Sequence, residues 1–294
     1  MTNKSSLLTK RMFGSRLLKI AGFVAVIIGL AGISGCSKEK NEQVDYNDYI
    51  TAGEEYVVLQ NLAHENLKWI YRAMQHPEMD DGIDTMRKVI VKRDSMGGDS
   101  VMYTLDYRKS WFDYDGLHKD SIIRIMAKGD MKQPGDKATA VLDGFQMEDR
   151  RFEGRIDYQK MKDTTGGLAV IRIRTQDVQY RDTTGRSHSI ELSQQAHVKK
   201  YLGTPGNMVL SFTVTGQAEG VASNQKAYNA IIPDTSLLLD SLTCTRIQSG
   251  HVVLQVDGGE AGHTYIDFLA PTDTCNRKYS IHLDNEKYDL LKSQ

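Results

Sequence analysis

The sequence predicts a mainly β (α+β) protein, an antiparallel meander or sandwich with an N-terminal helical segment packed on it. Before residue 76 apolar side chains recur at spacings of three and four, whereas after Asp99 they recur at every second position. Frequent turn signals separate the alternating segments, as in an antiparallel sheet. The 294 residues divide into a leader (1–35), a polar tether (36–46), a helical segment (47–98) and a β domain (99–294).

The leader has the layout of a bacterial lipoprotein signal. Basic residues precede an uncharged apolar run from Ile20 to Leu30, and the small residues Ser34 and Gly35 then lead into Cys36. A spanning helix needs about 20 apolar residues, and this run is shorter and rich in glycine, so an uncleaved anchor is the weaker alternative. We expect cleavage before Cys36 and acylation of its thiol. Several acyl chains, palmitate among them, would hold the protein on a membrane.

This anchor predicts an envelope location. We expect the outer membrane, and the sequence leaves open whether the protein lies on the periplasmic face or at the cell surface. The net charge is −1, and the leader contributes only basic residues, so the remainder of the chain is acidic overall. Nucleic-acid binding needs a concentrated basic surface, and we therefore expect no nucleic-acid partner.

The cysteines fit a compartment outside the cytoplasm. Once Cys36 is acylated, Cys244 and Cys275 remain as an even pair. Such a pair in an oxidising compartment predicts a disulfide bond, with two buried thiols as the alternative.

The helical segment follows the tether. Apolar residues such as Val58, Leu62, Trp69 and Ile70 form one stripe between Asn47 and about Gln75. Pro77 disfavours helical backbone in the residue before it and predicts the end of the helix. Residues 84–92 fit either a second short helix or an entering strand.

Five later segments alternate apolar and polar residues in the pattern of half-buried strands. Turn signals such as Pro134-Gly135 and Thr184-Gly185 lie between them. The alternating segments are 123–125, 171–174, 210–215, 252–256 and 279–284.

The order of strands and turns resembles a family of uncharacterised Bacteroides-type lipoproteins, over roughly residues 100–290. The chain departs from the family pattern at Leu117, where arginine is usual, and at Leu269-Ala270-Pro271, where glycines are usual. The resemblance implies a β-rich fold and an envelope location, and it supplies no activity. The segments that carry it are Tyr103-Thr104-Leu105-Asp106-Tyr107, Asp115-Gly116, Ser121-Ile122-Ile123-Arg124-Ile125, Lys132-Gln133-Pro134-Gly135, Leu142-Asp143-Gly144-Phe145, Phe152-Glu153-Gly154, Leu242-Thr243-Cys244, Ser249-Gly250, Ile266-Asp267-Phe268, Cys275-Asn276 and Tyr279-Ser280-Ile281.

Motifs for catalysis are weak. His64-Glu65 begins like the helix of a zinc peptidase, but Lys68 stands where the second histidine would be. We interpret this segment as a solvated helix face. Glu148 and Asp149 are neighbours on a predicted strand, and neighbours point to opposite faces, so they cannot act as a glycosidase pair. We predict no catalytic residue, no metal site and no other cofactor.

Aromatic residues gather between residues 103 and 114. Tyr107, Trp111 and Tyr114 are candidates for contact with a ligand, because a ring with a polar tip binds sugars and peptides at small entropic cost. Packing in the β core is the stronger alternative. Our prediction is a lipid-anchored extracytoplasmic protein that binds or serves structurally without catalysis, with a glycan- or peptide-directed hydrolase as the alternative. Its partners would be membrane lipid through Cys36 and a glycan, a peptide or an envelope protein.

Overall fold

A computed structural model describes most of the chain beyond residue 45. The described residues are 46–75, 82–86, 89–108, 117–129, 131–164, 168–202, 208–242, 244, 246–257, 264–268, 279–283 and 286–290. The side chains of 75, 83–86, 164, 168, 200–202, 208–210 and 286–290 are not described.

The first element of the described residues is a helix of 30 residues, α2 (Tyr46–Gln75). It confirms the predicted helix almost residue for residue. Asp48 in the first turn and Arg72 in the last turn complement the helix dipole. Leu59, Leu62 and Ile70 of the predicted apolar stripe are buried.

The other elements that the structure describes are strands of one antiparallel sheet. The sheet begins at Ile83, inside the range 47–98 that the sequence assigned to the helical segment, and the entering strand is therefore the correct alternative for residues 84–92. The strands are β1 (Ile83–Met86), β2 (Val89–Gly97), β3 (Ser100–Asp106), β4 (Ile122–Lys128), β5 (Lys137–Val141), β6 (Phe145–Met147), β7 (Arg150–Thr164), β8 (Leu168–Asp182), β9 (Ser187–Leu202), β10 (Met208–Val221), β11 (Ala227–Ile232), β12 (Leu238–Ser241), β13 (Gly250–Val256), β14 (Tyr265–Phe268), β15 (Tyr279–Leu283) and β16 (Glu286–Leu290).

The sheet is a meander in which neighbours in sequence are neighbours in space. The order is β1-β2-β3-β4-β5-β7-β8-β9-β10-β11-β13-β14-β15-β16. Two short strands lie beside this path, β6 on β7 and β12 on β10. Of the predicted alternatives, the described residues form the meander, and they form one sheet rather than the two stacked sheets of a sandwich.

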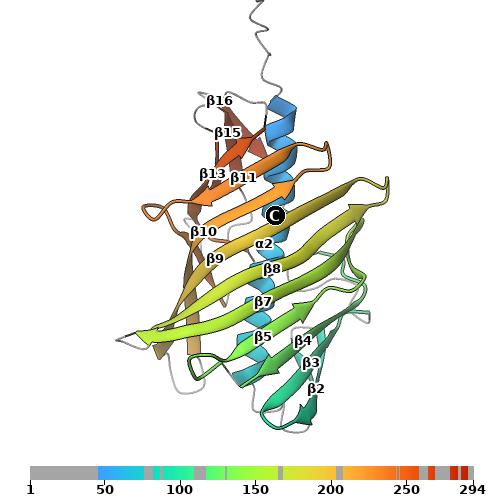
Figure 1. Cartoon of the computed structure of the whole chain (residues 1–294), viewed down its shortest axis with the longest axis vertical. Coiled ribbons are helices and arrows are strands. Elements are labelled where there is room, and N and C mark those ends of the chain that lie inside the picture. The colour runs from blue at the N-terminus through green and yellow to red at the C-terminus, as the bar shows by residue number, and fades with distance from the viewer. Residues whose placement is uncertain are drawn as a thin grey trace, which may run out of the picture. The chain divides into compact units, whose positions relative to one another are not determined.

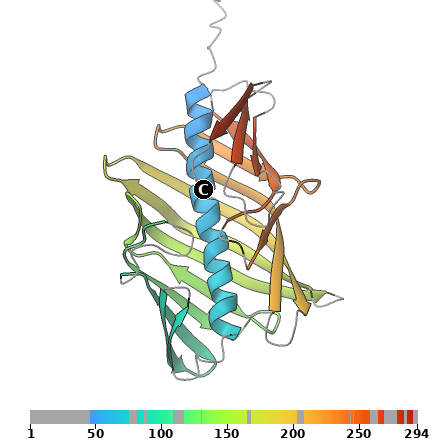
Figure 2. The same cartoon turned by 180° about the vertical axis from the view of Figure 1, so that it is seen from behind.

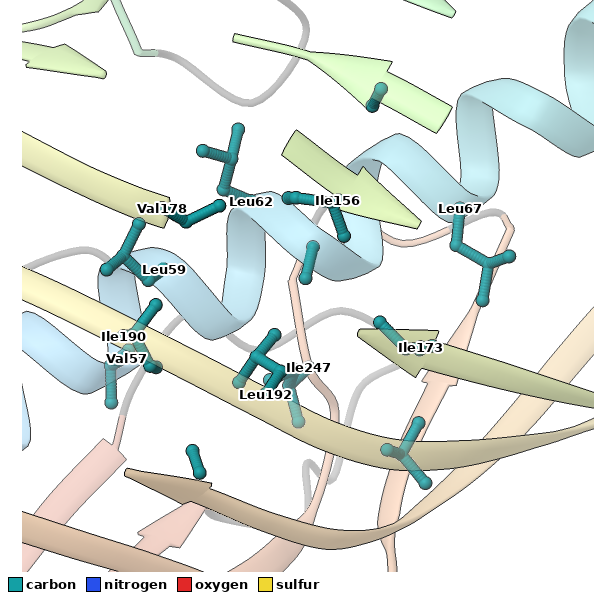
Figure 3. Packing of buried hydrophobic residues seen from close by; sticks show 14 of the residues in the cluster. Val57, Leu59, Leu62, Leu67, Ile156, Ile173, Val178, Ile190, Leu192 and Ile247 are labelled. Carbon is teal, nitrogen blue, oxygen red and sulfur yellow. The ribbon is translucent and has the colours of Figure 1, made fainter. Parts of the chain in front are cut away.

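The helix crosses the strands on one face of the sheet (Figures 1 and 2). Its residues Val57, Leu59 and Leu62 face Val178 and Ile190 of β8 and β9 (Figure 3). Every described side chain of α2 from Leu59 to Ala73 is buried. The sheet therefore encloses this half of the helix, whose polar residues are buried together with its apolar ones.

The segment after β12 covers the helix from another side. Lys68 Nζ donates a hydrogen bond to the Cys244 carbonyl, and the Ile247 amide donates one to Asn61 Oδ1. Arg72 donates to the Leu242 carbonyl. Three points of this segment are thus tied to the C-terminal half of α2.

Glycines allow the long strands to approach one another and bend. Gly216 of β10 has a φ of 121°, and a Cβ built there would lie 2.4 Å from the Ser193 carbonyl oxygen of β9. Glycine alone accepts both that dihedral and that approach. The irregular pairing of β8 with β9 between Arg174 and Val178 adds a second bend beside it.

Candidate functional site

The predicted site residues fall into two groups. Cys36, Trp111, Tyr114 and Cys275 lie outside the described residues. The predicted acylation and the predicted disulfide therefore stay predictions. Cys244 is buried, and Gln248 Nε2 donates a hydrogen bond to its sulfur at 3.1 Å.

Tyr107 belongs to the core rather than to a surface. Its side chain is 0% exposed, and its ring lies 6.5 Å from the Trp69 ring and 5.7 Å from the Phe145 ring between centroids. The Lys119 ammonium group lies over the Tyr107 ring, 5.3 Å from the ring centre. Core packing, the stronger alternative for these aromatics, is thus confirmed at Tyr107, which a ligand cannot reach.

The His64-Glu65 segment is not a solvated helix face, and that interpretation is wrong. His64, Glu65 and Lys68 are all buried. Glu65 pairs with Lys119 at 2.6 Å, and Asp240 of β12 pairs with both His64 Nδ1 at 3.1 Å and Lys68 Nζ at 2.8 Å. These contacts join one face of α2 to strands far away in the sequence, which the local pattern could not reveal.

Electrostatic neighbours keep the buried carboxylate of Glu65 charged. Burial alone would raise its pKa, but Lys119 opposes burial by both charge and hydrogen bond. Arg246 and Lys68 add to this effect, and the pKa of Glu65 falls to about 2. Burial lowers the pKa of Lys68, and Asp240 opposes that shift. The charged groups of this network are therefore buried and paired with one another, which is typical of a stabilising ion-pair network rather than of a reaction centre.

The structure also shows where Glu148, Asp149 and the possible metal-binding side chains lie. Glu148 and Asp149 form the turn of the β6–β7 hairpin, where Glu148 has a φ of 54°. They therefore lie in a turn rather than on a strand. Within the described ranges, no cluster of His, Cys, Asp and Glu side chains is arranged to hold a metal ion.

A shallow concave surface lies on the face of the sheet that points away from α2. We call it the outer groove; it has a volume of about 710 Å³ and spans β8, β9, β10, β11 and β13. Its lining residues are Asp177, Val178, Gln179, Ser189, Ile190, Glu191, Glu219, Gly220, Val221, Ala227, Tyr228, Asn229, Gln255, Val256 and Asp257.

The strand register arranges the polar side chains of the outer groove in rows. Glu191 is directly opposite Glu219, Glu219 is opposite Asn229, and Asn229 is opposite Gln255. We call these four residues the polar row. Because adjacent strands lie about 4.8 Å apart, the row presents one hydrogen-bonding side chain per strand across β9, β10, β11 and β13.

A second line of side chains runs beside the polar row. Gln179 is opposite Ser189, Ser189 is opposite Val221, and Val221 is opposite Ala227. Val221 is 39% exposed, so this line presents an apolar side chain as well as a hydroxyl and an amide group. Between the two lines, Ile190 and Tyr228 point inward and are buried against the helix side.

One atom of the polar row lacks a partner. The side-chain oxygen Oδ1 of Asn229 is buried and accepts no hydrogen bond. A buried acceptor without a donor costs free energy, and because this oxygen is buried it is not open to a ligand in the groove.

No local sequence pattern indicates this surface. Its residues lie between positions 177 and 257, mostly on five strands, and its polar members are residue types that are ordinary on an exposed strand face. Only the register brings Glu191 opposite Glu219. Predicting the pair from sequence would require the exact pairing of β9 with β10.

Comparison with protein-family models finds no match, and comparisons with curated proteins and with solved structures find none either. The resemblance to Bacteroides-type lipoproteins therefore stays a prediction. Among the described residues, no helix is long and apolar enough to cross a membrane.

Proposed function

We propose that this protein is a lipid-anchored, non-catalytic binding protein of the bacterial outer membrane, and that it holds a glycan in the outer groove. The single observation that supports the binding site is the polar row. Its members Glu219, Asn229 and Gln255 are carboxylate and amide groups, which accept and donate to neighbouring hydroxyls.

The enclosed helix supports this choice of surface. A ligand cavity between α2 and the sheet would need space that Leu59, Leu62 and their neighbours fill. The outer groove, in contrast, is open to solvent. A chain of sugar rings lying across the strands would meet a new hydrogen-bonding side chain at each strand.

The proposed location depends on the leader. Ser34, Gly35 and Cys36 provide the expected cleavage and acylation point, and residues 37–45 would tether the helix to the lipid. The pair Cys244 and Cys275 would form a disulfide in this oxidising compartment. Protease treatment of intact cells would show which face of the membrane the protein occupies.

Binding would be tested with the full-length acylated protein in detergent on an array of immobilised glycans. Glu219→Gln with Gln255→Ala should abolish the signals that the parent protein gives. Asp94→Asn is the matched control, since Asp94 lies on β2, far from the groove in strand order. Equal signals from parent and double variant would refute the groove as the binding site.

Glu191 opposite Glu219 also favours a second candidate, a retaining glycosidase. Directly opposed residues have Cβ atoms roughly 5 Å apart, which is close to the carboxyl separation of about 5–5.5 Å in such enzymes. A general acid, however, normally works from a buried apolar site, and both glutamates are exposed. We therefore expect no release of reducing sugar from any glycan that binds; release that Glu191→Gln eliminates would establish the enzyme instead.

A further inference from the structure

The outer face of the sheet carries opposite charges in its two halves. The outer groove is lined by four acidic residues and by no basic one; we call these residues, Asp177, Glu191, Glu219 and Asp257, the acidic half. On β4, β5, β7 and β8, six basic residues alternate with buried residues and therefore point to the same outer face. We call them the basic half: Arg124, Lys128, Lys137, Arg155, Arg172 and Arg174.

Neighbouring side chains do not neutralise the basic half. Among the described residues, none of the six forms an ion pair with a carboxylate. Asp157, an acidic residue in their midst, accepts hydrogen bonds from Thr139 and Gln176 instead. Lys128 lies directly opposite Lys137, and like charges in opposed positions are destabilising. Carboxylates from outside the chain would therefore stabilise the basic half.

One row of side chains across the strands joins the two halves. Arg155 of β7 is opposite Gln176 of β8, and Arg124 of β4 lies two strands further along the same row. The pairing of β8 with β9 is irregular around Gln176, and Glu191 lies in the corresponding part of β9, opposite Glu219 of β10. The row thus has arginines on one side of β8 and glutamates on the other.

A second copy of the chain has the charges that both halves lack. In a face-to-face pair, a two-fold axis parallel to β8 reverses the strand order of one copy relative to the other. β7 of each copy then lies over β9 of the other, and Arg155 faces Glu191 of the second copy. Arg174, which lines a hollow with Glu191 and Glu219, would lie at this axis. An axis perpendicular to the strands would instead place each half over its own kind, where like charges repel.

We propose that the outer face pairs with a second copy of this chain, with the basic half of each copy over the acidic half of the other. Arginine side chains would enter the outer groove of the second copy and bind its carboxylates, which guanidinium groups can contact through two parallel hydrogen bonds. Exposed apolar side chains beside both halves, Met126 and Val221, would add apolar contact. The inference does not depend on glycan binding, but the second copy would cover the outer groove and compete with a glycan for it.

Analytical ultracentrifugation of the full-length acylated protein in detergent would test this pairing. We expect a reversible species of twice the monomer mass. Its association constant should fall at least tenfold when salt is raised from about 50 to about 500 mM, because salt screens exposed charges. A parent protein that stays monomeric at roughly 100 μM would overturn the inference. Assemblies larger than a dimer would also overturn it, because a two-fold axis closes the pair.

Two charge-reversed variants locate the contact. The first is Glu191→Lys with Glu219→Lys, and the second is Arg124→Glu with Arg155→Glu. Each should be monomeric by itself, because both halves of its outer face then carry the same sign. An equal mixture should recover the pairing, which would also show that both variants are folded. Association of either variant by itself, or a mixture of folded variants that does not pair, would contradict the proposed contact.

A matched control and a milder pair of variants complete the test. Asp94→Lys with Asp99→Lys makes the same change in net charge on the β2–β3 hairpin, and this variant should pair like the parent. If a reversed variant does not fold, Glu219→Gln and Arg155→Gln take its place. Each should weaken the pairing at least about threefold, and unchanged affinity in both would overturn the inference.

The outcomes separate this inference from the glycan-binding function. A monomeric parent protein that binds glycans on the array would overturn the pairing alone. The variant Arg124→Glu with Arg155→Glu keeps the outer groove intact and uncovered. If the parent pairs and this monomeric variant binds no glycan, the glycan-binding function is overturned and the pairing stands.

Discussion

Glu191 and Glu219 of the outer groove are like charges at directly opposed positions, an arrangement that is generally destabilising. Replacing Glu219 by Gln removes one of two like charges that face one another across β9 and β10. We expect the free energy of unfolding to rise by about 0.2–1 kcal/mol, measured by urea denaturation at low salt. Asp94→Asn serves as the comparison, and a loss of stability in Glu219→Gln would show that the pair is not under repulsion. A residue that lowers stability is typical of a site kept for function.

The buried ion pair between Glu65 and Lys119, in contrast, stabilises the fold. Lys119→Met would leave the Glu65 carboxylate buried without its closest cation, which typically costs about 3–5 kcal/mol. Denaturant unfolding would measure the loss. Lys92→Met breaks an exposed pair with Asp94 and should change stability by less than about 1 kcal/mol. Adding Glu65→Gln to Lys119→Met should restore part of the loss; no restoration would mean that the uncompensated charge is not its cause.

His188 makes the fold sensitive to acid. Burial lowers its pKa to about 3, and Arg150 contributes. Its Nε2 lies 2.8 Å from the Tyr228 hydroxyl. In the unfolded chain the pKa is about 6.5, so between pH 6.5 and about 3 the unfolded state binds more protons. Stability from this residue therefore decreases as the pH falls through that range, by about 1.4 kcal/mol per unit.

The variant His188→Gln isolates this effect. Its stability relative to the parent should improve steadily as the pH is lowered from 7 to 5, a range above the one in which Glu65, with a pKa of about 2, loses its charge. Urea unfolding at several pH values provides the measurement. A constant difference between the two proteins across this range would contradict a neutral, buried imidazole.

At the scale of elements, the long strands depend on glycine where they bend. Gly216→Ala places a methyl group 2.4 Å from the Ser193 carbonyl oxygen in a backbone with a φ of 121°. We expect it to cost more than about 2 kcal/mol in the free energy of unfolding. Gly185→Ala is the matched control, because Gly185 also has a positive φ, 84°, but no atom lies within 4 Å of the added carbon. Equal losses would show that the close approach is unimportant.

The elements differ in how far the sequence predicts them. Alternation identified the strands now seen at 122–128 and 250–256, and the 3.6-residue period with Pro77 identified α2. Periodicity reports only whether one face of an element is apolar. Glu65 and Lys68 looked solvated because the partners that bury them, Lys119 and Asp240, are 54 and 172 positions away. The outer groove was missed for the same reason, since register determines it.

At the scale of the whole molecule, the predicted anchor depends on one side chain. Cys36→Ser removes the thiol that acylation requires, and each methylene group of an acyl chain contributes about 0.8 kcal/mol to membrane binding. We expect the variant to move from the detergent phase to the aqueous phase in a phase-separation experiment, while a Ser37→Ala control stays with the detergent. Mass spectrometry of the parent protein should show a modified Cys36 at its start; an intact Met1 would contradict the signal.

The enclosure of α2 also affects the order in which the parts of the protein can reach their final packing. The helix emerges early, but Asp240, which pairs with two of its side chains, belongs to a strand made near the end of the chain. Such a pairing closes a long loop and can form only when both segments are present. Until the last strands arrive, a charged helix surface and unpaired strand edges remain exposed to aggregation. The helix therefore reaches its buried, paired state only when the C-terminal third of the chain is in place.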